Sequence, residues 1–248
     1  AFLHTMSVYA YLFAIPFELY KKYGVRRYGF HGTSHRYVSQ RVCEYLGVSP
    51  EGKKIITCHI GNGGSITAVK DGKSIDTSMG LTPLEGLMMG TRSGDIDAGA
   101  VTFIMEKENL TAAGVSDLLN KKSGVKGIFG VSSDMRELEA AVAAGNNKMA
   151  DLTEKMYFYR IKKYIGAYAA ALGGVDIIVF TGGVGENQAS CRSGACEGLE
   201  YMGVKLDLEK NKIRGEEAVI SAEDSKVKVG VIPTDEELMI ASDSMAIL

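Results

Sequence analysis

Residues 59–97 contain the side chains best suited to chemistry on a phosphate group. The segment opens with His59 and the run Gly-Asn-Gly-Gly at 61–64, where backbone N–H groups could approach an anion closely because few side chains intervene. Near its end, Arg92 stands alone between glycines, and its planar guanidinium can pair with two phosphate oxygens at once. Each half alone is equally compatible with a glycine-rich hairpin and a surface ion pair, so the order and spacing of the pieces carry the argument.

Three motifs in this order resemble the signatures of the acetate kinase family. The first spans residues 26–35 and reads RRYGFHGTSH, the second begins at His59 and reads HIGNGGSI, and the third spans residues 82–97 and reads TPLEGLMMGTRSGDID. These motifs are long and specific, and the resemblance runs over nearly the whole chain. It implies ATP-dependent phosphorylation of acetate to acetyl phosphate, and the reverse reaction.

The resemblance also implies a domain organisation. Residues 1–248 would be mostly the second, nucleotide-binding domain of a two-domain kinase, with residues 1–25 forming a helix at the junction to the first domain. Full-length members carry a whole preceding domain, and this chain begins just after the position of the family's catalytic aspartate, so we expect both to be missing here. The opening run FLHTM departs from the family's usual FHQTM, so no role is transferred to His4.

Individual roles in the transfer follow from the resemblance. Acetate already carries the nucleophilic carboxylate, so the reaction needs alignment and charge stabilisation and no general base. Arg92 fits the charge role because a guanidinium stays protonated, and His31 fits a second donor to the transferred group. His59 would hold the γ-phosphate side of ATP.

The other residues that the resemblance implies divide by ligand. Phe30 and Pro83 resemble the family's apolar contacts to the acetate methyl group, and Glu236 would orient Mg²⁺, mostly through water. The implied cofactors are ATP or ADP and Mg²⁺, and the implied assembly is a homodimer. The nucleotide would be bound along its phosphates by His59, Ile60, Gly61, Asn62 and Gly63, and around adenosine by Asp134, Met135, Arg136, Gly183, Val184, Gly185, Glu186 and Asn187.

Structural explanations for several of these residues remain open. Asp134 could cap a helix and pair with Arg136, and a capping box of Thr234 with Glu237 would account for the neighbouring acidic residues. His35, inside the first turn of a helix, is expected to be a packed core histidine. The alternative functions are a propionate or butyrate kinase, and a nucleotide-binding or dimerisation module without chemistry.

The composition argues against several other classes of function. The 248 residues carry a net charge of −2 and are 46% hydrophobic, which is typical of a globular protein and gives no electrostatic reason to expect nucleic acid or an anionic membrane as a partner. No run approaches ~20 apolar residues, so no transmembrane helix is expected. The four cysteines lack the spacing of a zinc or redox motif, so we expect reduced thiols and a cytoplasmic location.

Hydrophobic periodicity and turn residues predict an α/β fold, with a mixed sheet flanked by helices. Residues 55–76 are expected to form two strands joined at Asp71-Gly72, and further strands are expected at 176–180, 218–221 and 226–231. The expected helices span 7–23 (bent or split at Pro16), a cap at Thr33 or Ser34 to 46, 97–108, 111–122, 134–144 and 146–172, then a stretch from the glycine loop at 181–187 to 202, and a last helix after Thr234. The resemblance implies the ribonuclease-H-like core of the actin-like ATPase superfamily.

Overall fold

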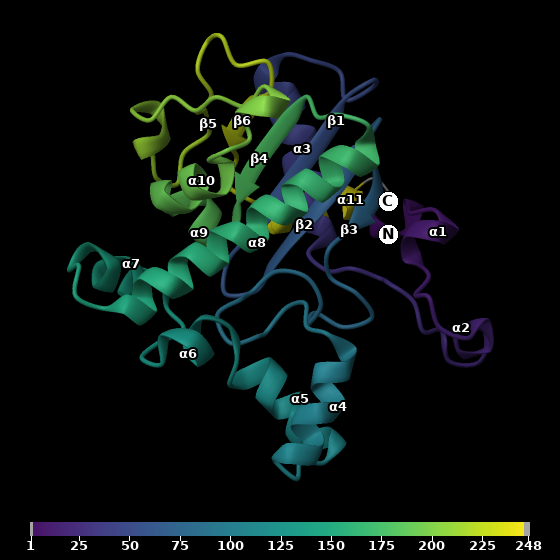
Figure 1. The fold of residues 1–248 in the computed structure, drawn as a ribbon. Helices are drawn as coiled ribbons and strands as arrows, with labels where there is room; N and C mark the ends of the chain where they lie inside the picture. The colour runs from purple at the N-terminus through teal and green to yellow at the C-terminus, as the bar shows by residue number, and fades with distance from the viewer. Residues whose placement is uncertain (1, 246–248) are drawn as a thin grey trace.

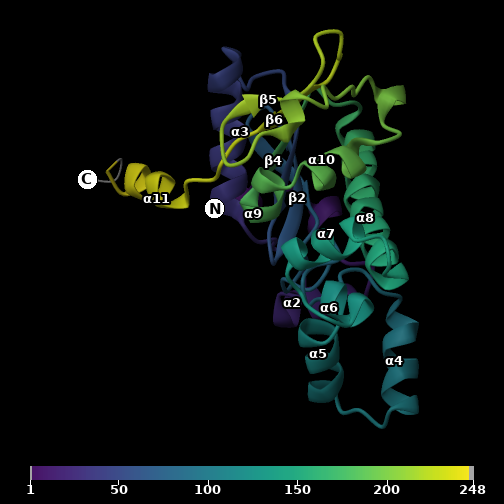
Figure 2. The ribbon, with the colours of Figure 1, turned by 90° about the vertical axis from the view of Figure 1, so that its left-hand side faces the viewer.

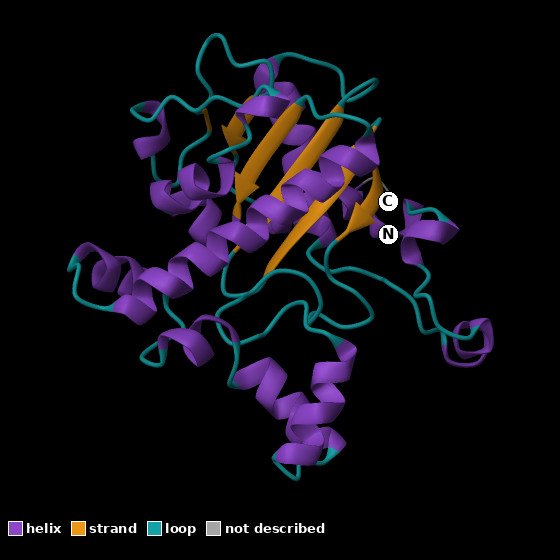
Figure 3. Cartoon of the chain, in the orientation of Figure 1, coloured by secondary structure: helices purple, strands orange, loops and turns teal. Residues whose placement is uncertain are grey.

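A six-stranded mixed sheet forms the centre of the protein in the computed structural model, which describes residues 2–245 (Figure 1 and Figure 3). The strand order is β3-β2-β1-β4-β6-β5. β1, β4 and β6 run parallel to one another, whereas β2, β3 and β5 are antiparallel to their neighbours. The strands are β1 (Lys54–Ile60), β2 (Gly64–Lys70), β3 (Lys73–Thr77), β4 (Ile177–Thr181), β5 (Ala218–Val219) and β6 (Lys228–Val231). The predicted mixed sheet flanked by helices is therefore confirmed.

Two long helices cover the two faces of this sheet. α8 (Lys148–Leu172) lies across one face, and α3 (Gly32–Leu46) packs against the other (Figure 1). Because successive side chains of a strand point to opposite faces, β1, β2 and β4 contribute buried side chains to both layers. The sheet is therefore buried on both sides, as expected for parallel strands flanked by helices.

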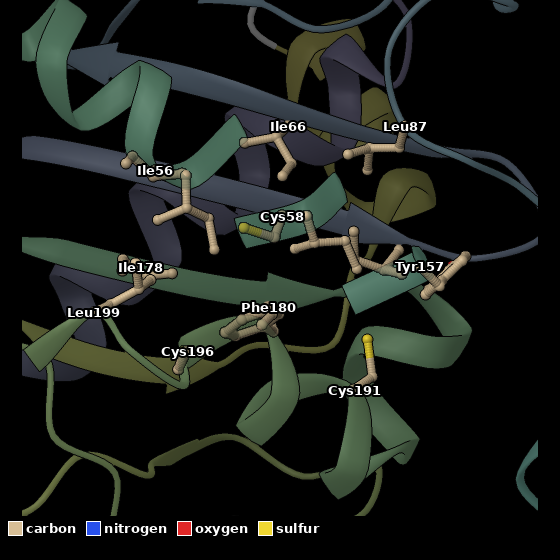
Figure 4. Packing of buried hydrophobic residues seen from close by; sticks show 14 of the residues in the cluster. Ile56, Cys58, Ile66, Leu87, Tyr157, Ile178, Phe180, Cys191, Cys196 and Leu199 are labelled. Carbon is tan, nitrogen blue, oxygen red and sulfur yellow. The ribbon is translucent and has the colours of Figure 1, made fainter. Parts of the chain in front are cut away.

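The larger apolar core lies between the sheet and α8. Ile56 of β1 and Phe180 of β4 are completely buried there together with Tyr157 of α8 (Figure 4). On the α3 side a smaller core joins Ile55 and Val179 to residues of α3 such as Val42. The two clusters share strands but no side chains.

The remaining elements surround these layers. α4 and α5 form a hairpin that projects away from the sheet at the bottom of both views, and α11 extends to one side of the molecule in the turned view (Figure 1 and Figure 2). The helices are α1 (Val8–Tyr11), α2 (Phe17–Tyr23), α4 (Ala98–Lys107), α5 (Ala112–Lys121), α6 (Gly124–Phe129), α7 (Met135–Ala143), α9 (Gly182–Asn187), α10 (Ala189–Cys196) and α11 (Glu236–Met245), with 3₁₀ turns at Phe2–Thr5, Glu200–Met202 and Lys210–Lys212.

Helices with a local cap match their predicted limits. Asp97 caps α4, Thr111 caps α5 and Asp134 caps α7, each accepting a bond from a backbone N–H in the first turn. Asn147 caps α8 in the same way, and Gly173 ends that helix in the left-handed conformation with φ 67°. These predictions hold because a cap and a stop residue are decided by neighbours along the chain.

The predicted hairpin at 55–76 contains three strands instead of two. Asp71 and Gly72 do form the tight turn, with φ values of 52° and 70°, but it joins β2 to β3. β1 and β2 are joined by the glycine-rich run itself, where the Gly61 N–H donates to the Gly63 carbonyl at 3.0 Å. The stretch expected to bind an anion is therefore a hairpin turn as well.

The prediction of one helix over 7–23 is wrong, but the predicted split at Pro16 is confirmed. Pro16 lacks an N–H and stands before α2, so the segment divides into α1 and α2, and Gly24 ends α2 with φ 66°. The predicted cap of α3 at Thr33 or Ser34 is also wrong. α3 begins at Gly32, with His31 at the N-cap position.

The glycine loop at 181–187 is largely helical, because α9 starts directly after β4. The helix predicted to reach 202 is interrupted, since α10 ends at Cys196 and a 3₁₀ turn follows. The predicted strands at 218–221 and 226–231 are shortened to β5 and β6, with Ser221 in an isolated bridge to Leu206. These ends depend on pairing with distant segments.

The predicted capping box of Thr234 with Glu237 is wrong, because the hydrogen bonds at the start of α11 join other partners. Asp235 accepts the N–H of Leu238 at 2.8 Å, while the Thr234 hydroxyl bonds to Ser34. The sequence of this last helix predicts that both Met239 and Ile240 face inward; Met239 does, whereas Ile240 is exposed.

Two composition-based expectations concern the whole chain. All four cysteines carry free, buried thiols. Within residues 2–245, no helix combines the length and the apolar character needed to cross a membrane.

Candidate active site

Strand alternation carries polar side chains to the α3 face at one end of the sheet. On β1, Ile56, Cys58 and Ile60 point into the core under α8, so Thr57 and His59 point toward α3. In the sheet register, His59 lies between Ser65 of β2 and Thr181 of β4. The carboxyl ends of β1 and β4 meet here, which is where ligands bind in α/β sheets.

Three histidines gather at this edge. His31 adopts φ 57° at the start of α3, and its ring stacks on that of His59 with 4.1 Å between centroids and 16° between planes. His35, one turn further along α3, lies 6.4 Å from His31 and 6.2 Å from His59 and is completely buried. The expectation that His35 is a packed core histidine is confirmed, and its packing is against the two candidate ligand-binding imidazoles.

Hydroxyl groups hold these rings in place. The Ser65 hydroxyl lies 2.9 Å from Nδ1 of His31 and 2.7 Å from Nε2 of His35. The Ser34 hydroxyl lies 2.8 Å from Nδ1 of His59. The sequence did not single out either serine for this role, because Ser34 looks like a helix cap and Ser65 like an ordinary strand residue.

Burial keeps all three imidazoles neutral. Desolvation, with a further contribution from the nearby Arg92 guanidinium, lowers the pKa of His31 to about 4. Desolvation and the proximity of His31 lower the pKa of His59 to about 3, and burial depresses the pKa of His35 well below its usual range. At neutral pH the three rings therefore act as neutral donors or acceptors, with one N–H each.

Arg92 reaches the same point from the loop that follows β3. A Cβ atom placed on Gly63 would lie 3.2 Å from Nη1 of Arg92 and 3.7 Å from Nε2 of His31. Nη1 of Arg92 donates to the Pro83 carbonyl at 3.1 Å, and no carboxylate in residues 2–245 forms an ion pair with this guanidinium. A fixed cation without an anionic partner, beside two imidazoles and a glycine turn, is suited to an anion such as phosphate.

A groove of about 690 Å³ adjoins this cluster through the β1–β2 turn. It runs between the N-terminus of α7 and helix α9. Most of the residues expected around adenosine line it. The lining consists of Gly61, Asn62, Gly90, Ser133, Asp134, Met135, Arg136, Glu139, Gly183, Val184, Asn187, Gln188 and Arg214.

Five of the expected nucleotide residues are not on this lining, among them His59 in the histidine cluster and Gly63 beside Arg92. Ile60 is buried in the core under α8, and Gly185 faces the sheet, where a Cβ would lie 3.6 Å from the Cys58 carbonyl. Glu186 turns back to the end of β4, where its Oε1 accepts the Gly182 N–H at 2.8 Å and the Thr234 N–H at 3.2 Å. Because the predicted loop is a helix, its residues point in different directions.

The structural explanation of Asp134 and Arg136 is confirmed. Asp134 accepts the Arg136 backbone N–H at 2.8 Å, and its carboxylate also pairs with the Arg136 guanidinium at 2.6 Å. That bonding holds the pKa of Asp134 at about 2. The same two side chains stand at the rim of the groove, so capping and ligand contact are compatible.

Arg192 supports the back of the groove and was missed in the sequence. It is completely buried, and its donors bond to the carbonyls of Gly185 and Glu186 on α9 and to the segment that precedes Arg214. A buried guanidinium bonded to neutral oxygens is costly, and it joins two walls of the groove. No sequence signal separates this arginine from an exposed one on a short helix.

The residues expected to contact acetate and Mg²⁺ make few contacts that indicate a ligand site. Phe30, which is half-buried, precedes His31, and Pro83 offers its carbonyl to Arg92. Glu236 is exposed in the first turn of α11, and the described part of the chain contains no group of three His, Cys, Asp or Glu residues that could hold a metal ion. A single carboxylate fits Mg²⁺ only if substrate phosphates and water supply most of its ligands, as is usual for this ion.

Comparison with known proteins gives one consistent result. Residues 1–242 match the sequence model of the acetokinase family. The acetate kinase of Phocaeicola vulgatus is 84% identical over 248 residues, which are the whole of this chain and 62% of that protein. The chain thus spans less than two thirds of the length of this curated relative.

Solved structures agree in fold. The crystal structure of Porphyromonas gingivalis acetate kinase matches with a TM-score of 0.97 and 60% identity, covering all of this chain and 62% of that one. A propionate kinase from Francisella tularensis matches with a TM-score of 0.91 and 43% identity, covering 98% of this chain and 62% of that one.

Proposed function

Because the chain belongs to the acetokinase family, we propose that it forms the nucleotide-binding part of an enzyme that transfers a phosphoryl group between ATP and acetate. The observation that carries this proposal is the continuity of two features. The groove between α7 and α9 leads through the Gly61–Gly63 turn to the point shared by Arg92 and His31. Adenosine in the groove would direct its phosphates toward those side chains.

The chemistry assigned to the cluster is charge stabilisation and alignment. Arg92 offsets the charge on the transferring group, and a preorganised donor of this kind is worth ~10²–10³ in rate. His31 donates to the same group, and His59 donates to the γ-phosphate side. The acetate carboxylate attacks directly, so a histidine-linked intermediate is unnecessary and the two neutral rings serve to align the phosphoryl group.

The proposal also assigns Glu236 to the binding of Mg²⁺. When bound, the ion would neutralise charge on the ATP phosphates, which supply its other ligands together with water. Glu236 stands four residues beyond Ile232, which follows β6, and its own helix is tied to the cluster because Thr234 bonds to Ser34.

The acyl group is assigned to the side of Phe30 and Pro83. Acetate is the proposed acceptor, and propionate is the second candidate because a propionate kinase shares this fold at 43% identity. Initial rates with acetate, propionate and butyrate, measured in the enzyme described below, separate these acceptors.

Three further parts of the proposal concern the whole protein. Residues 1–248 form mostly the second domain, with residues 1–25 at its junction to a first domain. The assembly is a homodimer, and the location is the cytoplasm. Light scattering on the purified protein tests the dimer, and a mass of one chain at micromolar concentration would contradict it.

Nucleotide binding by the chain alone is the first experiment. We expect calorimetry to detect weak ATP binding, because the adenosine groove lies within this chain. Gly183→Leu is a sharp control, since nothing lies within 4 Å of a Cβ at that position and a larger side chain would fill the groove without a clash. Unchanged ATP binding in Gly183→Leu would contradict the assignment of the groove.

Activity is the second experiment. The chain alone is expected to form no acetyl phosphate in a hydroxamate assay, because the proximity contribution of ~7–11 kcal/mol requires a second wall around the acceptor. A hybrid that joins this chain to the part of the Phocaeicola vulgatus enzyme it does not match should restore the reaction. Full turnover by the 248-residue chain would show that such a wall is dispensable.

A further inference from the structure

One hydroxyl group connects two imidazoles in the histidine cluster. Ser65 Oγ is 2.9 Å from Nδ1 of His31 and 2.7 Å from Nε2 of His35. A hydroxyl has one proton, so it can donate to only one of these nitrogens, and the other nitrogen must carry its own proton. It follows that two neutral rings bonded in this way hold the same tautomer, either both Nδ1–H or both Nε2–H.

The far end of this chain of bonds lies on β1. The Thr57 hydroxyl is 2.7 Å from Nδ1 of His35, whereas its other acceptor, the Thr67 carbonyl, is 3.4 Å away. An O···O separation of 3.4 Å lies beyond the usual range of about 2.5–3.0 Å for a hydroxyl donor, so the buried Thr57 proton is assigned to Nδ1 of His35, the acceptor within bonding distance. Nδ1 of His35 then accepts, Nε2 of His35 carries the proton and donates to Ser65, and Ser65 donates to Nδ1 of His31.

Arg92 gives independent support for this direction. Nε2 of His31 and Nη1 of Arg92 both border the position of a Gly63 Cβ, at 3.7 and 3.2 Å. If Nε2 were a bare acceptor, it would be a natural partner for the guanidinium, yet Nη1 donates to the Pro83 carbonyl. Two N–H donors that face the same space without bonding to each other leave a position for an acceptor.

The tautomer of His59 is fixed by a second series of hydrogen bonds, which runs from Thr234 through Ser34. The Thr234 hydroxyl donates to Ser34 Oγ at 2.8 Å, which leaves the Ser34 proton for Nδ1 of His59, also at 2.8 Å. The proton of His59 is therefore on Nε2. Both stacked rings receive a proton at Nδ1 from a serine and keep their own proton at the other nitrogen.

We propose that two buried hydroxyl relays, Thr57–His35–Ser65 and Thr234–Ser34, fix His31 and His59 as Nε2–H tautomers and so make both rings neutral donors toward bound phosphate. The use of these donors rests on the proposed function, whereas the tautomers do not depend on it. His35, which carries no proton to the ligand itself, is a positioning residue. The charged and titratable groups that face His31 are Arg92, His35 and His59, and none of them is an anion that would favour an imidazolium.

Nuclear magnetic resonance of the chain with ¹⁵N-labelled histidine reads the tautomers directly. Long-range ¹H–¹⁵N correlations at neutral pH identify the protonated nitrogen of each ring. His31, His35 and His59 are expected as Nε2–H, while the exposed His4 serves as a reference. A Nδ1–H form of His31, or opposite tautomers in His31 and His35, would overturn the proposal.

A matched pair of serine variants tests the relay further. Ser65→Ala should leave His31 with a mixture of tautomers and weaken ATP binding roughly fivefold to tenfold, the effect of one lost hydrogen bond. Ser74→Ala removes another buried hydroxyl, one without a bonding partner among the residues that the structure describes, and should change neither property. Ser65→Thr keeps the hydroxyl and should restore the single tautomer. A single Nε2–H form of His31 in Ser65→Ala would count against the relay.

The hydroxyl relay and the proposed function can be contradicted separately. The tautomers are read without nucleotide, so they decide the relay by themselves. If the wild-type chain shows these tautomers and binds no ATP at millimolar concentration, the relay stands and the proposed function is contradicted.

Discussion

The two faces of β1 use the same backbone for different purposes. Toward α8, Ile56, Cys58 and Ile60 are completely buried among apolar side chains. Toward α3, Ile55 is apolar, but Thr57 and His59 join a hydrogen-bonded cluster that continues to the candidate phosphate site. One face stabilises the fold through apolar burial. The other face changes, between Ile55 and His59, from apolar packing to hydrogen-bonded polar side chains.

This difference shows how a sheet edge can be both stable and reactive. The buried polar groups on the α3 side are costly unless they are bonded, and the histidine–hydroxyl network meets that requirement. The apolar layer on the α8 side gives the stability that offsets such a network. Substitutions on the two faces should therefore separate stability from ligand chemistry.

The largest expected effect is on the α8 face. Ile56→Ala removes a fully buried side chain and should lower the free energy of unfolding by about 2–5 kcal/mol, measured by urea denaturation, because a cavity remains in the core. Ile56→Val is the matched control, with an expected loss of ~0.5–1.5 kcal/mol. The histidine tautomers should be unchanged in both. A shift of the His59 signals in Ile56→Val would show that the two faces are not independent.

Arg92→Ala should have the next largest effect, and it concerns chemistry only. In the hybrid enzyme, turnover should fall by ~10²–10³ because a preorganised charge donor is lost, while ATP affinity changes much less. Hydroxamate assays and calorimetry measure the two quantities. Near-normal turnover would remove Arg92 from the mechanism, and Arg92→Lys should recover little because an ammonium lacks the planar fork.

The third prediction concerns acid. The pKa of His31 falls from 6.5 to about 4 on folding and that of His59 to about 3, so the unfolded chain binds more protons below pH 6.5. Stability is therefore full above pH 6.5 and falls as the pH drops, by on the order of 3 kcal/mol for His31 by pH 4. Urea midpoints between pH 7 and 4 measure the slope.

Two histidine variants make that test specific. His31→Gln should reduce the slope between pH 6.5 and 4, whereas His4→Gln, at an exposed position, should keep it. An unchanged slope in His31→Gln would show that the acid sensitivity arises in other groups.

The smallest effect is expected at the exposed rim of the groove, which belongs to neither face. The Arg136 side chain is 86% exposed, so its ion pair with Asp134 is well solvated. Arg136→Ala should leave the urea midpoint unchanged and weaken ATP binding roughly twofold to threefold, as expected for one solvated contact. A hundredfold loss of ATP affinity would mean that Arg136 is desolvated when nucleotide binds.

Local sequence decided the features that depend on neighbouring residues. Asp134 caps α7 as predicted, and Asp97, Thr111 and Asn147 cap the helices predicted at 97–108, 111–122 and 146–172, because capping is a bond between residues two or three apart. Gly173 ends α8 in the left-handed conformation. The strand at 176–180 was also predicted, because a continuous apolar run between turn residues is typical of a buried parallel strand. The motifs around His59 and Arg92 indicated phosphate chemistry for the same reason, since each is a compact pattern.

Tertiary structure decided which side chains meet. Ser34 looked like a helix cap and instead bonds to His59, 25 residues away, and Thr234 bonds to Ser34 across 200 residues. Glu186 bonds to Gly182 at the end of β4 and does not line the groove, because the segment expected as a glycine loop is helix α9. Arg192 connects two walls of that groove. The sequence by itself determined the family and most element types, but not α9 or the third strand of the first hairpin. Only the packing of α3 against β1 determined the histidine network, because hydrogen bonds between distant segments depend on register and on the face each side chain occupies.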